Sequence, residues 1–186
     1  MIKIGLASDH AGFELKEFVK KYIEQKGYIY KDFGAYTADS SDYPDYAHPL
    51  AMAVEAGKTG EAEKIITNYE LRITKKEITE GKEEETEEAG EDQGIDLGIA
   101  MCGSGNGIAM TLNKHQGIRA AICWNTEIAR VTRAHNDANI LVLPARFISR
   151  EEVAEMINIF LNTPFEGGRH QRRVEKIGLP KELSSF

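Results

Sequence analysis

Residues 95–107 read Ile-Asp-Leu-Gly-Ile-Ala-Met-Cys-Gly-Ser-Gly-Asn-Gly, an apolar run followed by a loop in which every second residue is glycine. The run from Ile95 to Met101 predicts a buried strand, and the residues after the loop can continue as a helix. Alternating glycines let the chain turn sharply with its backbone N–H groups pointing inward. Such groups before a helix form a site for phosphate or another oxyanion. We therefore expect a strand, an anion-binding loop and a helix here.

Cys102 begins this loop, where the positive end of a helix favours a thiolate. A thiolate beside anion-stabilising N–H groups suits proton transfer at a carbon acid. Two ordinary alternatives stay open: a glycine-rich turn without a ligand, and a buried cysteine that packs as a small hydrophobe. The loop lacks the Lys-Ser or Lys-Thr ending of a nucleoside-triphosphate loop. Its glycines at 103, 105 and 107 also do not match the G-x-G-x-x-G spacing of dinucleotide-binding loops, although a loose Rossmann variant remains an alternative.

Strand and helix signals alternate along most of the chain. Alternating strands and helices predict right-handed crossovers and a mainly parallel sheet covered on both faces. We therefore predict an α/β fold, a Rossmann-like three-layer sandwich that forms a single domain over residues 1–186. The expected strands are 2–7, 28–33, 95–101, 118–123 and 140–143, and the expected helices are 12–26, 46–56, 109–114, 126–134, 149–162 and one opening near residue 167.

The negative charge of the chain is concentrated in one segment. Residues 58–92 hold twelve acidic and six basic side chains, a net charge of −6 out of −7 for the whole chain. Residues 81–92 form a low-complexity acidic tract that cannot bury apolar area. Tyr69, Leu71 and Ile73 alternate with polar residues, which suggests a short strand or a hairpin edge, with a frayed helix as the alternative. We expect a solvated surface insertion at about 58–93, and a partner-binding role is the less favoured alternative.

Composition argues against several classes of protein. The negative charge disfavours a general nucleic-acid binder. No apolar stretch approaches the roughly 18 residues of a membrane span, and the strand-like N-terminus leaves no room for a signal peptide. Two cysteines, Cys102 and Cys123, do not make a disulfide framework. We therefore expect a cytoplasmic protein that binds neither nucleic acid nor membrane.

Several polar residues lie next to the ends of predicted strands. Ligands of parallel α/β folds bind beyond the carboxyl ends of strands, so these residues can converge on one site. For Asp9 and His10 the alternative is a helix N-cap beside a surface histidine. For His135 it is a buried histidine held by backbone groups. Asp9, His10, Cys102 and Arg146 follow predicted strands, whereas His135 and Asn136 directly precede the strand at 140–143 and could approach from a neighbouring edge.

Residues 167–173, Gly-Gly-Arg-His-Gln-Arg-Arg, form a basic cluster in an acidic protein. Arg169 and Arg173 are four residues apart, so on a helix they share a face and two guanidinium groups can clamp one phosphate dianion. The alternative is a set of solvated surface ion pairs. The preceding glycines favour a ligand.

Several ordered motifs together resemble the B-type ribose-5-phosphate isomerases and their relatives, the allose-6-phosphate and galactose-6-phosphate isomerases. The similarity covers nearly the whole chain except about 58–93, where the family usually has only a few residues. The motifs are Ser8–Lys16, Asp42–Ala47, Cys102–Gly107, Asn113-Lys114, Gly117–Ala121, His135–Asn139 and Phe165–Arg173.

The resemblance implies a homodimer or homotetramer with active sites shared between subunits, and no metal or organic cofactor. By position, Cys102 matches the proton-transferring base, and Ile108 stands where another branch has a glutamate base. His135 matches the histidine that assists opening of the furanose ring. The remaining matches are substrate-binding positions. Asp9 and Asn136 match positions that bind the sugar, and the backbone amides of the loop match an anion hole: Gly103, Ser104, Gly105, Asn106 and Gly107. Four further positions match residues that bind other parts of the substrate, with the arginines suited to phosphate: His10, Arg146, Arg169 and Arg173.

The resemblance and the residue types together predict an aldose–ketose isomerase of the pentose phosphate pathway that interconverts ribose 5-phosphate and ribulose 5-phosphate. Cys102 would move a proton between C2 and C1 through a cis-enediolate, and Ser104 would relay a proton between the oxygens. Allose 6-phosphate or galactose 6-phosphate stays an alternative substrate. A non-catalytic phosphosugar-binding protein should have lost Cys102 or His135, and a nucleotide binder would use Asp32 as its ribose clamp.

Overall fold

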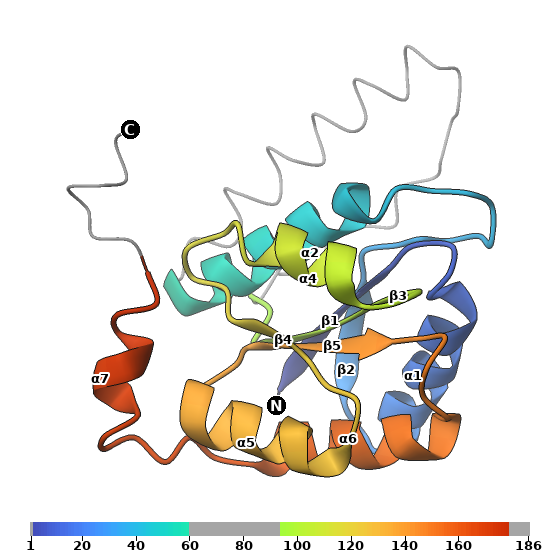
Figure 1. Cartoon of the computed structure of the whole chain (residues 1–186). Helices are drawn as coiled ribbons and strands as arrows, with labels where there is room; N and C mark the ends of the chain where they lie inside the picture. The colour runs from blue at the N-terminus through green and yellow to red at the C-terminus, as the bar shows by residue number, and fades with distance from the viewer. Residues whose placement is uncertain (1, 60–93, 179–186) are drawn as a thin grey trace, which may run out of the picture.

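The computed structural model describes residues 2–59 and 94–178 of the 186-residue chain. Within these residues, five strands form one parallel sheet in the order β2–β1–β3–β5–β4 (Figure 1). The strands are β1 (Lys3–Ser8), β2 (Ile29–Asp32), β3 (Leu97–Cys102), β4 (Ala120–Ile122) and β5 (Ile140–Pro144). The predicted α/β fold with a parallel sheet is confirmed.

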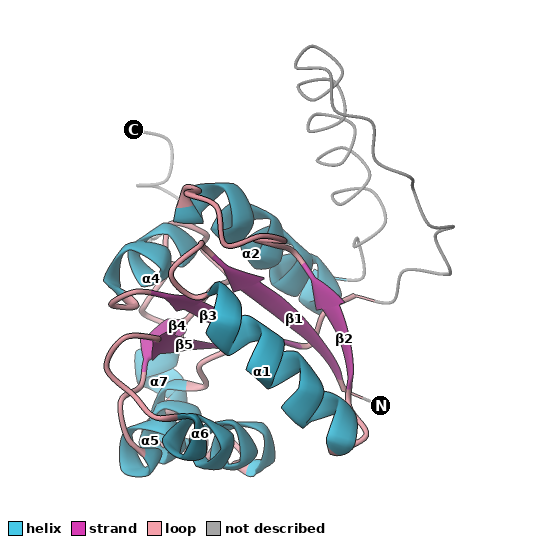
Figure 2. Ribbon diagram, turned by 90° about the vertical axis from the view of Figure 1, so that its right-hand side faces the viewer, coloured by secondary structure: helices cyan, strands magenta, loops and turns pink. Residues whose placement is uncertain are grey.

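Helices cover both faces of the sheet (Figure 2). Helices α2 (Tyr43–Thr59) and α4 (Asn106–Leu112) pack on one face. Helices α1 (Phe13–Gln25), α5 (Thr126–Asn136) and α6 (Arg150–Asn162) pack on the other. The short helix α7 (Gln171–Val174) follows α6. Over the part of the chain described, no helix is long and apolar enough to cross a membrane.

Successive residues of the central strands enter different cores, because side chains alternate between the two faces of a strand. In β3, Ile99 and Met101 pack with α1, α5 and α6, whereas Ala100 and Cys102 pack with α2 and α4. Both faces are buried, so the strand is a continuous apolar run rather than an alternation of apolar and polar residues. This double burial places Cys102 at the end of a rigid, fully packed strand.

Two helices begin earlier than the sequence predicts. Helix α2 begins at residue 43 rather than 46, because Pro44 fits a first turn, where a missing N–H costs no intrahelical bond. Helix α4 begins directly at Asn106 rather than at residue 109. The strand, hairpin edge or frayed helix predicted around residues 69–73 lies outside the described residues.

A buried ion pair anchors the end of β2. Lys16 Nζ is fully buried and lies 2.6 Å from Asp32 Oδ2. Burial lowers the pKa of Lys16, and its hydrogen bond to Asp32 opposes that shift. Asp32 Oδ1 also accepts the Gly34 N–H at 2.9 Å. Asp32 is therefore committed to the fold, which argues against its use as the ribose clamp of a nucleotide-binding protein.

A carboxylate and two histidines form a hydrogen-bonded chain between α2 and the turn after α4. His48 Nδ1 lies 2.9 Å from His115 Nε2, and His115 Nδ1 lies 3.3 Å from Glu55 Oε2. Glu55 Oε1 accepts the Gly117 N–H at 2.6 Å. Burial lowers the pKa of His48, and the neighbouring His115 lowers it further.

We expect His48 to make the fold sensitive to acid. Because its folded pKa lies below the usual value of 6.5, the unfolded chain takes up a proton at a pH where the folded chain does not. His48 therefore makes the free energy of unfolding rise with pH in the window just below 6.5. This contribution of His48 is lost when the solution is acidified through that window. As the pH is lowered from about 7 to about 5, the melting temperature of the wild type should fall. The melting temperature of His48→Asn should fall less steeply over the same range. Equal slopes for wild type and His48→Asn would contradict this prediction.

Candidate active site

Strand β3 carries Cys102 to the carboxyl edge of the sheet, where the chain turns into α4. Gly105 is the N-cap of α4 and has a φ of 77°, a conformation that glycine adopts without steric cost. The cap offers no side-chain acceptor to the first N–H groups of the helix. Ser104 Oγ accepts the Asn106 N–H at 3.3 Å. The remaining N–H groups of this turn suit a bound anion, as the sequence predicts.

Asp9 and His10 lie beside this loop because β1 and β3 are neighbouring strands. Ser8 pairs with Met101, so Asp9 follows the end of β1 just where Cys102 ends β3. The Asp9 carboxylate is buried and accepts the Gly12 N–H at 3.0 Å. It therefore closes the turn before α1, although Gly12 itself is the N-cap. Main-chain atoms of Ser41 lie 3.1 and 3.2 Å from His10 Nδ1 and hold the imidazole.

Arg146 and Tyr43 complete the surroundings of the loop. The N–H of Arg146 donates to Gly103 O at 3.1 Å, and a Cβ added at Gly103 would lie 3.4 Å from Arg146 Nε. The Tyr43 ring lies against Gly107, where an added Cβ would come within 2.5 Å of the ring. The sequence analysis gave Tyr43 no role, although it lies in a family motif. We call this group the loop half-site; it comprises Asp9, His10, Tyr43, Arg146 and residues 102–107.

A second polar group lies at the other edge of the sheet. His135 and Asn136 end α5, and Arg119, just before β4, donates from Nε to Asn136 O at 3.1 Å. In Figure 1, β3 and β5 point to the right, whereas α7 and the residues before it lie to the left. We call this group the histidine half-site; it comprises His135, Asn136, Glu166, Arg169, His170 and Arg173.

The two half-sites do not meet within one chain. Pro144 at the end of β5 pairs with Cys102, whereas Ile140 at its start pairs with Gly98 and follows the end of α5. The strand alone separates the two edges by roughly 13 Å. Within a single chain, His135 and Asn136 therefore do not converge with Cys102. The physical reason is that α5 runs antiparallel to the strands and ends at their amino edge. The sharing of sites between subunits that the family resemblance implies stays a prediction.

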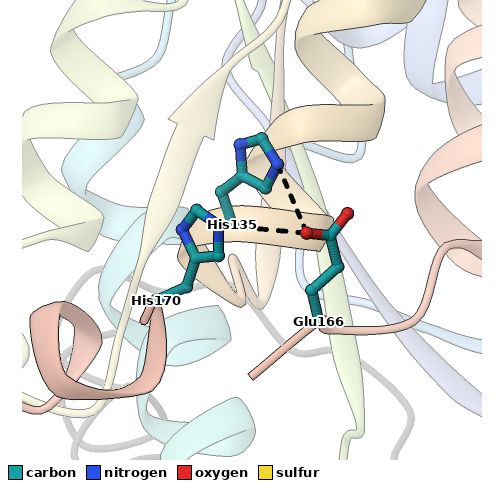
Figure 3. Close-up of side chains that lie close together, drawn as sticks. All are labelled: His135, Glu166 and His170. Atoms are coloured by element: carbon teal, nitrogen blue, oxygen red, sulfur yellow. Dashed lines mark ion pairs between the residues drawn. The ribbon is translucent and has the colours of Figure 1, made fainter. Parts of the chain in front are cut away.

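Within the histidine half-site, two imidazoles face one carboxylate (Figure 3). His135 Nε2 and His170 Nε2 lie 3.6 and 3.8 Å from Glu166 Oε2. The two rings stack with centroids 4.3 Å apart and planes 1° apart. Burial lowers the pKa of His170, and the charges of His135 and Arg169 lower it further. Neutral His170 can therefore accept the hydrogen bond that Arg169 Nε donates to its Nε2 at 3.3 Å.

The basic cluster differs from the prediction in its local structure. The final helix is a single turn, Gln171–Val174, so Arg169 lies before it and does not share a helix face with Arg173. Both arginines are exposed. Sequence reasoning missed Glu166 and His170 as site residues. The available signal was their place in the motif of residues 165–173, which also holds both arginines.

Comparison with known proteins identifies the family. The family model for Ribose/Galactose Isomerase matches residues 4–68 and 84–177. The chain belongs to this family. The unmatched residues 69–83 lie inside the segment 58–93 that the sequence analysis set apart as an insertion.

Individual relatives agree with this assignment over almost their whole length. The probable ribose-5-phosphate isomerase B of Mycoplasma pneumoniae is 36% identical over 94% of this chain and 91% of its own. Ribose-5-phosphate isomerase B of Escherichia coli is 32% identical over 95% of both chains. The crystal structure of a ribose 5-phosphate isomerase from Thermotoga maritima superposes with a TM-score of 0.75 and 39% identity, covering 95% of this chain and 97% of that one. The protein is a sugar phosphate isomerase.

The two thiols of this isomerase should differ in reactivity. Cys123 is fully buried, and burial raises the pKa of its thiol to about 12. Iodoacetamide at about pH 8 should therefore leave Cys123 unmodified in the folded protein, since the thiolate is the reactive form. Peptide mass mapping measures this, and alkylation in urea is the control. Labelling of folded Cys123 as fast as in urea would contradict the prediction.

Proposed function

We propose that this isomerase interconverts ribose 5-phosphate and ribulose 5-phosphate, with Cys102 as the base. The observation that carries the proposal is the position of Cys102 at the end of β3, directly before the glycine loop and α4. The similar structure from Mycoplasma genitalium, with a TM-score of 0.71 and 32% identity, was solved with bound ribulose-5-phosphate. Several other relatives, such as that of Bacillus subtilis, are named only putative sugar phosphate isomerases.

In the proposed reaction, the Cys102 thiolate removes the C2 proton of the open-chain aldose and returns it to C1. Electron density moves onto the C1 oxygen, and the resulting cis-enediolate is held by the N–H groups of the loop. One such donor contributes about 3 kcal/mol in comparable oxyanion sites. Ser104 relays the proton between the O1 and O2 oxygens, which leaves the ketose and restores the thiolate.

The other residues bind the substrate and open its ring. Asp9 and Asn136 bind sugar hydroxyls, and His135 moves the proton between the O1 hydroxyl and the ring oxygen. His10 and the arginines bind the rest of the substrate, because a guanidinium fork matches the geometry of a phosphate. The substrate-binding arginines are Arg146, Arg169 and Arg173. No step of this scheme calls for a metal or an organic cofactor.

We infer that each active site combines the loop half-site of one subunit with the histidine half-site of another. The two half-sites lie at opposite edges of one sheet, so a single chain cannot bring Cys102 and His135 to the same sugar. A homodimer, alone or within a homotetramer, satisfies this requirement. Cys102 and Cys123 are both free thiols, which supports the further proposal of a cytoplasmic location.

Turnover on three sugar phosphates tests the proposed substrate. We expect the highest kcat/KM on ribose 5-phosphate, compared with allose 6-phosphate and galactose 6-phosphate. Cys102→Ala should abolish turnover and leave phosphate affinity largely intact, because the arginines remain. Cys123→Ala is the matched control, since Cys123 lies in the core away from the loop. Preference for a hexose, or full turnover by Cys102→Ala, would overturn the proposal.

Subunit complementation tests the shared site. Cys102→Ala and His135→Asn should each be inactive alone. A mixed dimer of the two variants has one site with both residues intact, because the intact Cys102 and the intact His135 come from different subunits. Unfolding and refolding the variants together should therefore restore turnover, whereas Cys102→Ala mixed with Cys102→Ser should stay inactive. Failure of the first mixture despite verified mixed dimers would show that both residues act within one chain.

We propose further that residues 58–93 are an insertion in a single domain and are not needed for chemistry. The segment leaves and re-enters the fold at one point, because a Cβ added at Gly94 would lie 2.3 Å from Gly57 Cα. Replacing residues 60–93 with a short glycine linker should therefore leave the fold closed. We expect kcat/KM within about threefold of wild type. A variant that folds, as judged by its circular dichroism, but has lost all turnover would contradict this proposal.

A further inference from the structure

The structure assigns a second ligand to the histidine half-site. We propose that His135, His170 and Glu166 bind a divalent transition-metal ion of the Zn²⁺ type, and that the bound ion reversibly arrests the isomerase. The binding part stands on geometry alone. The arrest rests on the proposed function, in which His135 opens the sugar ring.

The three side chains supply a ligand set that zinc prefers. Two imidazole nitrogens and one carboxylate oxygen form the protein ligands of several zinc sites, with the fourth position left to water. Ligand atoms about 2.1 Å from a tetrahedral ion stand roughly 3.4 Å apart. The two Nε2 atoms here lie 3.6 and 3.8 Å from Glu166 Oε2, and all three ligand atoms lie within 4.8 Å of one another. Bringing the three ligand atoms to the spacing of a tetrahedral site requires side-chain movements of no more than about 2 Å.

The backbone already holds these side chains together. Glu166 N–H donates to Ala134 O at 3.0 Å, which ties the segment carrying Glu166 to the residue before His135. His170 N–H donates to Gly167 O at 3.0 Å and closes the turn between Glu166 and His170. The backbone that carries the three ligands is therefore held in place before an ion binds. Imidazole ligands favour transition metals over hard ions such as Mg²⁺.

In this structure the lone pair of His170 Nε2 is directed at Arg169. Arg169 Nε–H donates to His170 Nε2 at 3.3 Å, so that nitrogen carries the lone pair and Nδ1 carries the proton. An ion takes the place of this donor, so the guanidinium of Arg169 competes with the metal. The two rings must also tilt out of their parallel stack for both lone pairs to meet one ion, and the χ2 torsion of histidine is soft. The bound ion then occupies the nitrogen with which His135 would move protons.

Metal titration of the full-length protein tests binding without reference to activity. Co²⁺ should give the visible absorption of a tetrahedral ion, and Zn²⁺ should displace it, whereas Mg²⁺ should not. Glu166→Gln and His170→Asn should each weaken Zn²⁺ binding at least about tenfold, and Arg169→Gln should tighten it. The matched controls Glu175→Gln and His115→Asn, as well as Cys102→Ser, should bind as wild type. Unchanged affinity in Glu166→Gln and His170→Asn, or loss of binding only in Cys102→Ser, would overturn the proposal.

A second measurement tests the arrest. Zn²⁺ at concentrations that fill the site should remove wild-type turnover, and a chelator should restore it. Glu166→Gln should need at least about tenfold more Zn²⁺ for the same inhibition. Turnover that persists at full occupancy would overturn the arrest. A protein that binds Zn²⁺ at these residues but turns over no sugar phosphate would instead refute the proposed function and leave the metal site standing.

Discussion

All five strands of the described sheet run in the same direction, so each helix between them must run back along the sheet before the next strand can start. Residues that follow strands therefore gather at the carboxyl edge, and residues that end helices gather at the amino edge. Cys102 belongs to the first class and His135 to the second. The direction of the strands thus separates two groups of polar residues that the proposed reaction uses together, and in that proposal a second subunit reunites them.

The parallel sheet also explains why much of the fold could be predicted. A strand buried on both faces is a continuous apolar run, as in residues 95–101, and such runs are conspicuous between helical segments. The bounds of the helices depended on finer effects. Pro44 looks like a helix breaker until it is placed in the first turn of α2, and Asn106 looks like loop until Gly105 is seen to cap α4. These helix starts depend on backbone conformation and tertiary packing, which the hydrophobic periodicity of the sequence does not reveal.

The candidate site was predictable in parts, for a different physical reason. The glycine loop carries its geometry in its own sequence, because alternating glycines next to a strand allow few other arrangements. The histidine half-site is not local in this sense. His135 and His170 stack only because α5 and the turn before α7 meet at the amino edge, and nothing in the spacing of 35 residues signals it. Glu166 could not be predicted as part of this group for the same reason. A glutamate before two glycines is common in surface loops, and only the folded chain brings it opposite two imidazoles.

The chemistry of the two half-sites differs in a way that follows from their surroundings. At the carboxyl edge, Arg146 lies beside the backbone N–H groups of the loop, a combination that suits a negatively charged ligand. At the amino edge, Glu166 Oε2 faces both imidazoles, Arg169 Nε donates to His170 Nε2, and burial lowers the pKa of His170. A neutral imidazole offers a lone pair, and that lone pair can take a proton from a sugar hydroxyl or bind a metal ion. In the two proposals, a single imidazole lone pair of the histidine half-site therefore serves either the sugar or a transition-metal ion, whereas the backbone N–H groups of the loop can serve only an anion.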